Sequence, residues 1–417
     1  MLDINKIRNE LEEVKKALAK RMPLAAIDSA FKKIITLDNE RRELLKKSEE
    51  LKSERNIASK TKPTPKIIAK MKAVGEEIQG FDEKLKKVES NFNEAMAELP
   101  NIPAADVLPG GKENNRVIKT FGEKREFNFT PKDHYDLAVA LDIIDYERAV
   151  KMSGSGFWIY KGAGAILEWA ILSYFIKFHQ ANGYIFMIPP FLLTEQSAYT
   201  SGHLPKFRDD LFWTQDKQCL NATSEMMLGN YHRDEIIPEQ SLPLKYCAYS
   251  ACFRREAGSY RKEERGMIRG HQFNKIEMFH YTRPEQSWDS FAELVASAEK
   301  LVEGLGLHYQ SVQLAAEDAS AAMAKTIDVE AWIPSMASYK EVSSVSNALD
   351  YQARRGNVRY KNKETGKNEF VHTLNASGLA TSRLIPAILE QLQNADGSVD
   401  VPEVLQPFCG FDKIFKC

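Results

Sequence analysis

The stretch that decides the fold runs from Phe253 to Phe279 and has the sequence FRREAGSYRKEERGMIRGHQFNKIEMF. Its flanks, Tyr246–Phe253 and Phe273–Phe279, are short apolar runs of strand length and composition. A longer segment crowded with Arg, Lys and Glu separates them. This pattern predicts two antiparallel strands joined by a long charged loop. A long loop without structure of its own usually acts on a ligand.

Charged side chains also occur within the expected strands. Arg254 and Glu256 are two residues apart and are expected to share one face of the first strand. Glu277 stands in the apolar frame of the second strand. A solvated hairpin with a charged tip is the alternative that composition alone favours. Because a face that mixes Arg and Glu is costly to bury without partners, we expect it to line a polar pocket.

The arrangement of FRRE at 253–256, a loop, HQF at 271–273 and Glu277 resembles motif 2 of the class II aminoacyl-tRNA synthetases. The resemblance implies that Arg254 holds the α-phosphate of ATP and that Phe273 stacks on the adenine. Both roles suit the side chains, because a guanidinium group binds phosphate bidentately and an aromatic face stacks on a flat base.

The length and composition indicate the number of domains and the cellular compartment. The chain has 417 residues, enough for two or three domains, and its net charge of −1 means that any basic patch must be local. The five cysteines form no C-x-x-C pair, which indicates reduced thiols of an intracellular protein. The N-terminus lacks the apolar segment of a signal peptide, and no window approaches 18 consecutive apolar residues. We therefore expect a cytoplasmic protein without a membrane partner.

The first hundred residues are predicted to be helical. Residues 1–20 are expected to form a short helix and residues 21–28 a break. From Ser29 to Leu99 apolar residues recur at steps of three and four, with one interruption at Lys62–Pro65. Two prolines between two apolar seams predict an antiparallel coiled-coil hairpin with its tip near residues 61–65.

The outer half of this hairpin has basic residues and no acid between positions 55 and 72. A solvated coiled coil is the alternative explanation. Clustered Lys and Arg release counterions when they bind nucleic acid, so we expect a tRNA-binding arm. Its expected contacts are Arg55, Lys60, Lys62, Lys66, Lys70 and Lys72.

The segment 100–111 (PNIPAADVLPGG) is rich in Pro and Gly and predicts a linker. The expected domains are therefore the arm at 1–99, this linker, and a catalytic domain at 112–417. An apolar helix over 165–182 and a strand over 184–188, ending at two prolines, resemble motif 1 and imply a homodimer. Core packing of the same helix is the alternative. The nearby GAG at 162–164 lacks the third glycine of a dinucleotide-binding fingerprint.

Two further short motifs lie between these segments and the end of the chain. Thr223-Ser224-Glu225 could be only a helix cap, but it resembles the serine-binding Thr-x-Glu element. Alternation along the strand that contains Glu341 places Ser344 on the opposite face unless a bulge intervenes; these two residues resemble the oxygen ligands of the Mg²⁺ that accompanies ATP. The segment 345–359 is expected only to bridge to the next motif.

The segment 374–383 resembles motif 3, with a strand of small residues, a turn at Gly378 and a helix that carries Arg383 in its early turn. The resemblance implies that this arginine reaches the γ-phosphate of ATP. Ser382 stands where the family usually has glycine, immediately before the arginine.

Over essentially the whole chain, these motifs are similar to those of the bacterial-type seryl-tRNA synthetases. The resemblance implies an α+β fold, in which an N-terminal antiparallel α-helical coiled-coil hairpin precedes a class II catalytic domain on a mixed, mainly antiparallel sheet with flanking helices. It implies a ligase that uses ATP and Mg²⁺ to activate L-serine as seryl-adenylate. The seryl group would pass to tRNA(Ser) and to selenocysteine tRNA. Another class II synthetase, a paralogue that charges a carrier protein and a non-catalytic RNA-binding paralogue are the alternatives.

The resemblance assigns roles residue by residue. Glu225 and Glu277 are carboxylates suited to a substrate ammonium and hydroxyl, and a pocket that binds a hydroxyl can reject alanine by roughly 10⁴–10⁵. The expected catalytic residues are Arg254, Glu256 and Arg383. The expected ATP and Mg²⁺ contacts are Arg254, Arg255, Glu256, Phe273, Glu341, Val342, Ser343, Ser344 and Arg383. The expected serine contacts are Thr223, Ser224, Glu225, Arg254, Glu277, Asn375 and Ser377.

Overall fold

The computed structural model describes residues 1–60, 64–256 and 266–416. It divides into two compact units, Met1–Pro100 and Asn101–Cys417. Each unit has its own buried core and is described separately below.

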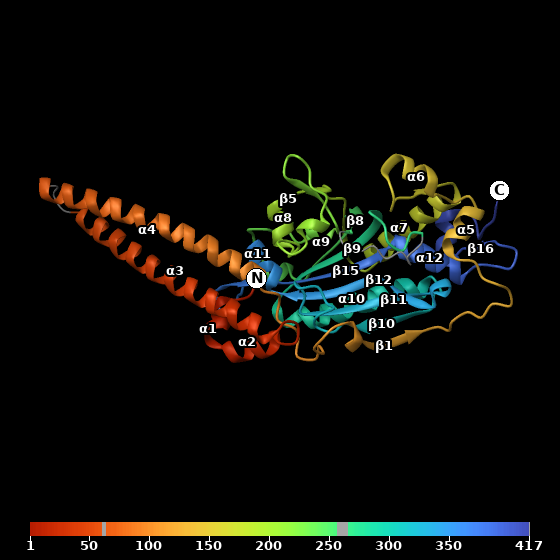
Figure 1. Cartoon of the computed structure of the whole chain (residues 1–417), viewed down its shortest axis with the longest axis horizontal. Coiled ribbons are helices and arrows are strands. Elements are labelled where there is room, and N and C mark those ends of the chain that lie inside the picture. Colours follow the sequence, from red (N-terminus) through yellow and green to blue (C-terminus); the bar gives the residue numbers. More distant parts are fainter. Residues whose placement is uncertain (61–63, 257–265, 417) are drawn as a thin grey trace. The chain divides into compact units, whose positions relative to one another are not determined.

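The N-terminal unit is built on two long helices, α3 (Leu24–Ala58) and α4 (Pro65–Glu98), which pack along each other (Figure 1). Two short helices, α1 (Ile4–Asn9) and α2 (Leu11–Leu18), precede them. The predicted apolar seam is the buried face of the pair and includes Ile34, Val74, Ile78, Val88 and Phe92. The prediction of a helical hairpin is confirmed.

Two boundaries in this unit differ from the prediction. The expected helix over 1–20 breaks at Glu10, whose φ and ψ of −128° and 36° are not helical. The first long helix begins at Leu24 rather than Ser29. Pro23 occupies the N-cap position in an extended conformation, so it precedes the helix instead of interrupting it. At the start of α4, the Thr64 side chain accepts a hydrogen bond from the Ile67 N–H, and Pro65 takes the first helical position.

An eight-stranded sheet organises the second unit, in the order β1-β10-β11-β12-β15-β9-β8-β4. Neighbouring strands are antiparallel except β4 and β8, which are parallel, so the predicted mixed and mainly antiparallel sheet is confirmed. The strands are β1 (Arg116–Phe121), β4 (Ile185–Met187), β8 (Leu244–Phe253), β9 (Gln272–Thr282), β10 (Tyr309–Gln313), β11 (Lys325–Ile333), β12 (Ser338–Leu349) and β15 (His372–Ala380).

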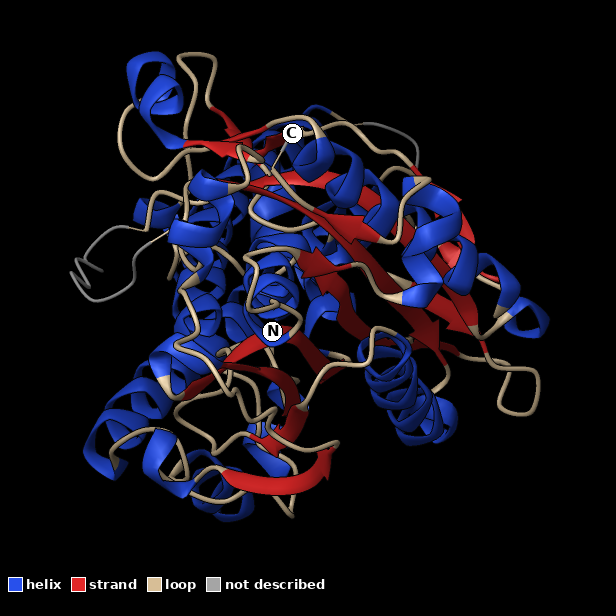
Figure 2. Ribbon diagram, turned by 90° about the vertical axis from the view of Figure 1, so that its right-hand side faces the viewer, coloured by secondary structure: helices blue, strands red, loops and turns tan. Residues whose placement is uncertain are grey.

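Three helices cover one face of this sheet: α7 (Ala163–Ala181), α10 (Ser287–Gly304) and α12 (Thr381–Gln391). Figure 2 shows the strands as a curved layer with helices packed along it. Side chains alternate on β9, so that Ile276 and Met278 enter the core beneath these helices. The side chains of the intervening positions are on the opposite face, where the candidate site lies.

Short elements complete the second unit. The helices are α5 (His134–Ala140), α6 (Tyr146–Ser153), α8 (Glu195–Thr200), α9 (Glu225–Leu228), α11 (Tyr351–Gly356) and α13 (Gln406–Cys409). The strands are β2 (Ile144–Asp145), β3 (Ile159–Tyr160), β5 (Leu192–Thr194), β6 (Gln218–Leu220), β7 (Ile236–Ile237), β13 (Arg359–Lys361), β14 (Asn368–Phe370), β16 (Val399–Asp400) and β17 (Lys413–Ile414).

A bulge in β12 changes which side chains share a face. Ser343 pairs with Val329 and Glu341 pairs with Glu330, so Val342 is an extra residue without a cross-strand partner. Simple alternation would separate Glu341 from Ser344. The bulge instead puts both residues on the site face.

The strand ends also differ from the sequence prediction. β8 ends at Phe253, and Glu256 has a φ of +51°, so Arg254 and Glu256 do not share a strand face. β15 does not turn at Gly378 but continues to Ala380, where α12 begins. Among the described residues, no helix is long and apolar enough to cross a membrane.

Candidate functional site

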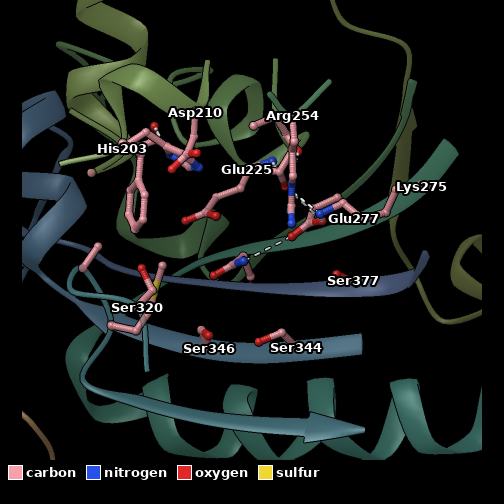
Figure 3. Close-up of a pocket in the computed structure, with 18 of the residues that line it drawn as sticks. His203, Asp210, Glu225, Arg254, Lys275, Glu277, Ser320, Ser344, Ser346 and Ser377 are labelled. Atoms are coloured by element: carbon pink, nitrogen blue, oxygen red, sulfur yellow. Dashed lines mark hydrogen bonds and ion pairs between the residues drawn. The ribbon is translucent and has the colours of Figure 1, made fainter. Parts of the chain in front are cut away.

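A cavity of about 430 Å³ lies on the face of the sheet opposite the α7, α10 and α12 core. Figure 3 shows side chains from several strands and from the segment 201–228 converging on it. Ten residues of the sequence-predicted site line this cavity: Thr223, Glu225, Arg254, Glu256, Glu277, Glu341, Ser344, Asn375, Ser377 and Arg383. A smaller adjoining cavity is lined by Phe273 together with several of the same residues.

One part of the cavity is a buried polar cluster around Glu277. The Lys275 ammonium lies 2.5 Å from Glu277 Oε2 and donates a hydrogen bond to Thr223 Oγ1 at 2.7 Å. Asn375 Nδ2 donates to Glu277 Oε1 at 3.1 Å. Each of these side chains is less than a tenth exposed. The cluster therefore offers hydrogen bonds and charge to a small polar ligand in a nearly dry environment.

Glu225 is the second carboxylate of this region. It begins α9 after the short turn Thr223-Ser224, and its Oε1 accepts a hydrogen bond from Gln352 Nε2 at 2.6 Å. Burial raises the pKa of Glu225 to about 7, and the neighbouring negative charge of Glu277 acts in the same direction. A cationic ligand group would favour its ionised form.

The other part of the cavity is rich in arginine. Arg383 Nη1 lies 3.1 Å from Glu341 Oε2, and the Arg254 guanidinium lies over the Phe273 ring at 5.2 Å from its centroid. Burial alone would raise the pKa of Glu341, but the positive charges of Arg383 and Arg254 outweigh it and lower the pKa. Two guanidinium groups beside an aromatic ring suit a nucleotide with its phosphates.

Glu256 contacts an arginine from the far end of the charged segment. Arg269 Nε donates to Glu256 Oε2 at 2.6 Å, and Arg269 lines both cavities. Glu256 thereby positions a cation at the arginine-rich part of the cavity.

The bulge in β12 creates a pair of oxygen ligands. Glu341 and Ser344 both face the cavity, and Ser344 pairs across the strands with Asp328. The Asp328 side chain is 7% exposed, and its Oδ1 has no hydrogen-bond partner among the described residues. The donor set consists of the Glu341 carboxylate, the Ser344 hydroxyl and the unsatisfied Asp328 oxygen on the neighbouring strand. Oxygen donors of this kind fit a hard divalent cation. In the described part of the chain, this region included, no group of three or more His, Cys, Asp or Glu could hold a metal ion.

Four residues of the expected site lie outside both cavities. Ser224 is buried and donates to Ser250 Oγ at 2.7 Å, and Ser343 is buried with its hydroxyl donating to the Ser377 carbonyl. Val342 enters the core. Arg255 is exposed, and its backbone N–H donates to the Asp210 carbonyl.

Several lining residues were missed by the sequence analysis. Lys275 could have been found, because it lies two residues from both Phe273 and Glu277 and therefore shares their strand face. Gln352 does not line the cavity but contacts Glu225, and it could not have been found, since it belongs to a segment expected only to bridge two motifs. His203 and Ser320 come from segments that carry no recognisable motif.

Beneath the site, one buried carboxylate joins three elements. Glu168 on α7 is 2% exposed, and its Oε1 accepts hydrogen bonds from Asn274 Nδ2 on β9 and Thr381 Oγ1 on α12, each at 2.8 Å. Asn274 follows Phe273 on β9, and Thr381 precedes Arg383 by two residues. Glu168 therefore fixes the strand and the helix that carry the aromatic and cationic side chains of the site.

The helical hairpin carries the other expected functional residues. Arg55, Lys60, Lys66 and Lys72 are exposed, and so is Lys70, whose ammonium lies 2.5 Å from Glu54 Oε1. Lys62 lies outside the described residues.

Comparison with known proteins identifies both units. Residues 1–103 match the family model "Seryl-tRNA synthetase N-terminal domain", and residues 207–392 match "tRNA synthetase class II core domain (G, H, P, S and T)". The chain is 53% identical to "Serine--tRNA ligase 2" of Clostridium acetobutylicum, over 99% of this chain and 100% of the relative.

Solved structures agree with these matches. Seryl-tRNA synthetase from Pyrococcus horikoshii, solved in complex with ATP, superposes with a TM-score of 0.92 at 33% identity and full coverage of both chains. Cytoplasmic serine-tRNA ligase from Naegleria fowleri, solved with AMP, gives a TM-score of 0.87 at 31% identity, over 100% of this chain and 99% of that one. The chain therefore belongs to the seryl-tRNA synthetase family, the serine–tRNA ligases built on the class II synthetase core.

Proposed function

We propose that the chain activates L-serine with ATP to form seryl-adenylate and pyrophosphate, and then transfers the seryl group to the 3′ end of tRNA(Ser). The observation that carries this proposal is the composition of one cavity. It combines a dry cluster for a small hydroxylated ammonium compound, around Glu277 and Glu225, with arginines suited to a triphosphate, Arg254 and Arg383.

In the first step, the serine carboxylate oxygen attacks the α-phosphorus of ATP while the bond from that phosphorus to the bridging oxygen of pyrophosphate breaks. No protein base is needed, since the carboxylate is already ionised. Arg254 would neutralise the α-phosphate and Arg383 the γ-phosphate, and Phe273 would stack on the adenine. Positioning and charge neutralisation of this kind can supply most of the rate enhancement of phosphoryl-transfer chemistry.

A magnesium ion is part of the proposal. Glu341 and Ser344 would hold it, with Asp328 behind Ser344. When bound, Mg²⁺ would supply positive charge between the phosphates. Glu256 would keep Arg269 directed towards the same region.

In the second step, a terminal ribose hydroxyl of tRNA attacks the seryl carbonyl carbon, and AMP leaves with the electrons of the broken mixed-anhydride bond. The arm at 1–99 would hold the tRNA through its exposed basic residues, and the linker at 100–111 would join it to the catalytic domain at 112–417. We extend the proposal to selenocysteine tRNA as a second acceptor of the seryl group. The reaction would take place in the cytoplasm.

The proposed enzyme is a homodimer. Large apolar side chains are exposed on α7 and around β4, with 56% of Trp169, 57% of Ile185 and 70% of Ile188 accessible to solvent. Exposed apolar groups of this size in neighbouring elements are typical of a protein interface.

Serine-dependent exchange between ATP and pyrophosphate tests the first step, with threonine, alanine and glycine run alongside. We expect exchange with serine alone. Arg254→Ala is the matched inactive control, because a lost phosphate contact made in the transition state should cost about 3–4 kcal/mol. Absence of serine-dependent exchange by the wild-type protein, or normal exchange by folded Arg254→Ala, would contradict the proposal.

A further inference from the structure

Gln352 on α11 lies behind the amino-acid pocket, and each polar atom of its side chain has a partner. Its Nε2 donates to Glu225 Oε1 at 2.6 Å and to the Ser201 carbonyl at 2.9 Å. Its Oε1 accepts a hydrogen bond from Thr373 Oγ1 at 2.7 Å. Gln352 and Thr373 are both buried, and such buried hydrogen bonds are costly to break because water cannot replace them.

Thr373 on β15 fixes the direction in which this amide points. The Glu225 carboxylate and the Ser201 carbonyl accept hydrogen bonds from Gln352, whereas the Thr373 hydroxyl donates one to it. A reversed amide would set its oxygen against two acceptors. The NH₂ group of Gln352 is therefore held towards the pocket.

The amide joins two parts of the pocket wall that belong to different segments. Glu225 begins α9, and Ser201, which also lines the cavity, follows the end of α8. A second side chain of α11 supports the same segment, since Arg355 Nη1 donates to the Leu204 carbonyl at 2.7 Å. α11 therefore holds the backbone beside Ser201, and Gln352 connects that backbone to the Glu225 carboxylate.

The contact also affects the charge of Glu225. Burial and the negative charge of Glu277 raise the pKa of Glu225 to about 7, and the hydrogen bond from Gln352 opposes them. Without this donor, the pKa of Glu225 would be higher and its carboxyl group would be mostly protonated at neutral pH.

We propose that Gln352 is a positioning residue for amino-acid activation, which holds the Glu225 carboxylate and the backbone at Ser201 in the arrangement that receives the amino acid. Gln352 does not line the cavity, so it acts through these two groups. The inference rests on the proposed function, because it takes serine as the substrate. It gives α11, in a segment expected only to bridge two motifs, a part in binding the amino acid and none in binding ATP.

Gln352→Leu tests this inference, because it removes both donors at little change in side-chain size. The serine KM and the ATP KM are measured by pyrophosphate exchange from pH 6 to pH 9. We expect the serine KM at pH 7 to rise at least about tenfold, as for the loss of a hydrogen bond to a charged group, and the ATP KM to stay near the wild-type value. The pH above which the serine KM becomes constant should rise by about one unit.

Thr373→Val reaches the same contact from the other side and does not depend on how Gln352→Leu folds. It frees the amide to turn, so the serine KM and its pH profile should move in the same direction by a smaller amount. Thr365→Val, at an exposed position, is the matched control and should behave as the wild type. An unchanged serine KM and pH profile in either folded variant, Gln352→Leu or Thr373→Val, would overturn the proposal.

A double-mutant cycle separates positioning of Glu225 from a general effect on the fold. Because glutamine at position 225 cannot ionise, adding Gln352→Leu to Glu225→Gln should weaken serine binding less than it does in the wild type and should shift no pH profile. Equal losses in both backgrounds would overturn the proposal. The same cycle is measured by isothermal titration calorimetry with serine, which needs no turnover. Absence of pyrophosphate exchange by the wild-type protein would therefore contradict only the proposed function.

Discussion

Replacing Glu168 by glutamine should change the pH dependence of stability in a calculable way. Burial raises the pKa of Glu168 to about 7, against the hydrogen bonds from Asn274 and Thr381, which favour the ionised form. Because the folded state holds this proton more tightly than the unfolded state, Glu168 destabilises the fold progressively as the pH rises. The loss begins near the ordinary pKa of 4.5 and is complete above about pH 7.

The magnitude follows from the two pKa values. Raising a carboxyl pKa from 4.5 to about 7 corresponds to about 3 kcal/mol of unfolding free energy, at 1.36 kcal/mol for each pH unit. Glutamine cannot ionise, and its carbonyl oxygen can still accept both hydrogen bonds. Glu168→Gln should therefore gain stability relative to the wild type by about 3 kcal/mol between pH 4.5 and pH 8.

Urea unfolding followed at several pH values measures this difference directly. Contributions from other titrating groups, including Glu225, cancel when the variant is compared with the wild type at each pH. Glu147→Gln, at an exposed position of α6, is the matched control and should follow the wild type. Parallel curves of stability against pH for the wild type and Glu168→Gln would refute the reasoning.

Three further predictions concern binding and assembly. The serine KM should rise by up to about tenfold per pH unit below pH 7, because protonation removes the Glu225 charge, and it should become nearly independent of pH in Glu225→Gln; a flat wild-type profile from pH 6 to pH 8 would argue against this. Neutralising Lys60, Lys66 and Lys70 together should raise the tRNA KM and flatten the dependence of log affinity on log salt by somewhat less than one for each lost contact, leaving pyrophosphate exchange intact; an unchanged slope would make them ordinary surface residues. Trp169→Glu should dissociate the proposed dimer in sedimentation experiments, and a monomeric wild-type protein would rule the dimer out.

Local patterns in the sequence were sufficient for the main architecture. The hairpin follows from apolar residues at helical spacing on both sides of a proline-containing break, and the antiparallel pair β8 and β9 follows from two apolar runs around a charged segment. Both predictions succeed because the spacing of apolar residues and the composition of a segment depend only on residues close together in the chain.

The sequence by itself determined which residue types are available for the site, and most of those expected from the motifs do line one cavity. Only the tertiary structure decided how they pair. The bulge at Val342, which brings Glu341 and Ser344 to one face, depends on the register with β11. The contacts of Lys275 with Thr223 and of Glu225 with Gln352 join residues 52 and 127 positions apart. The physical reason is that burial, charge compensation and strand register arise from segments distant in the chain, and no local pattern records them.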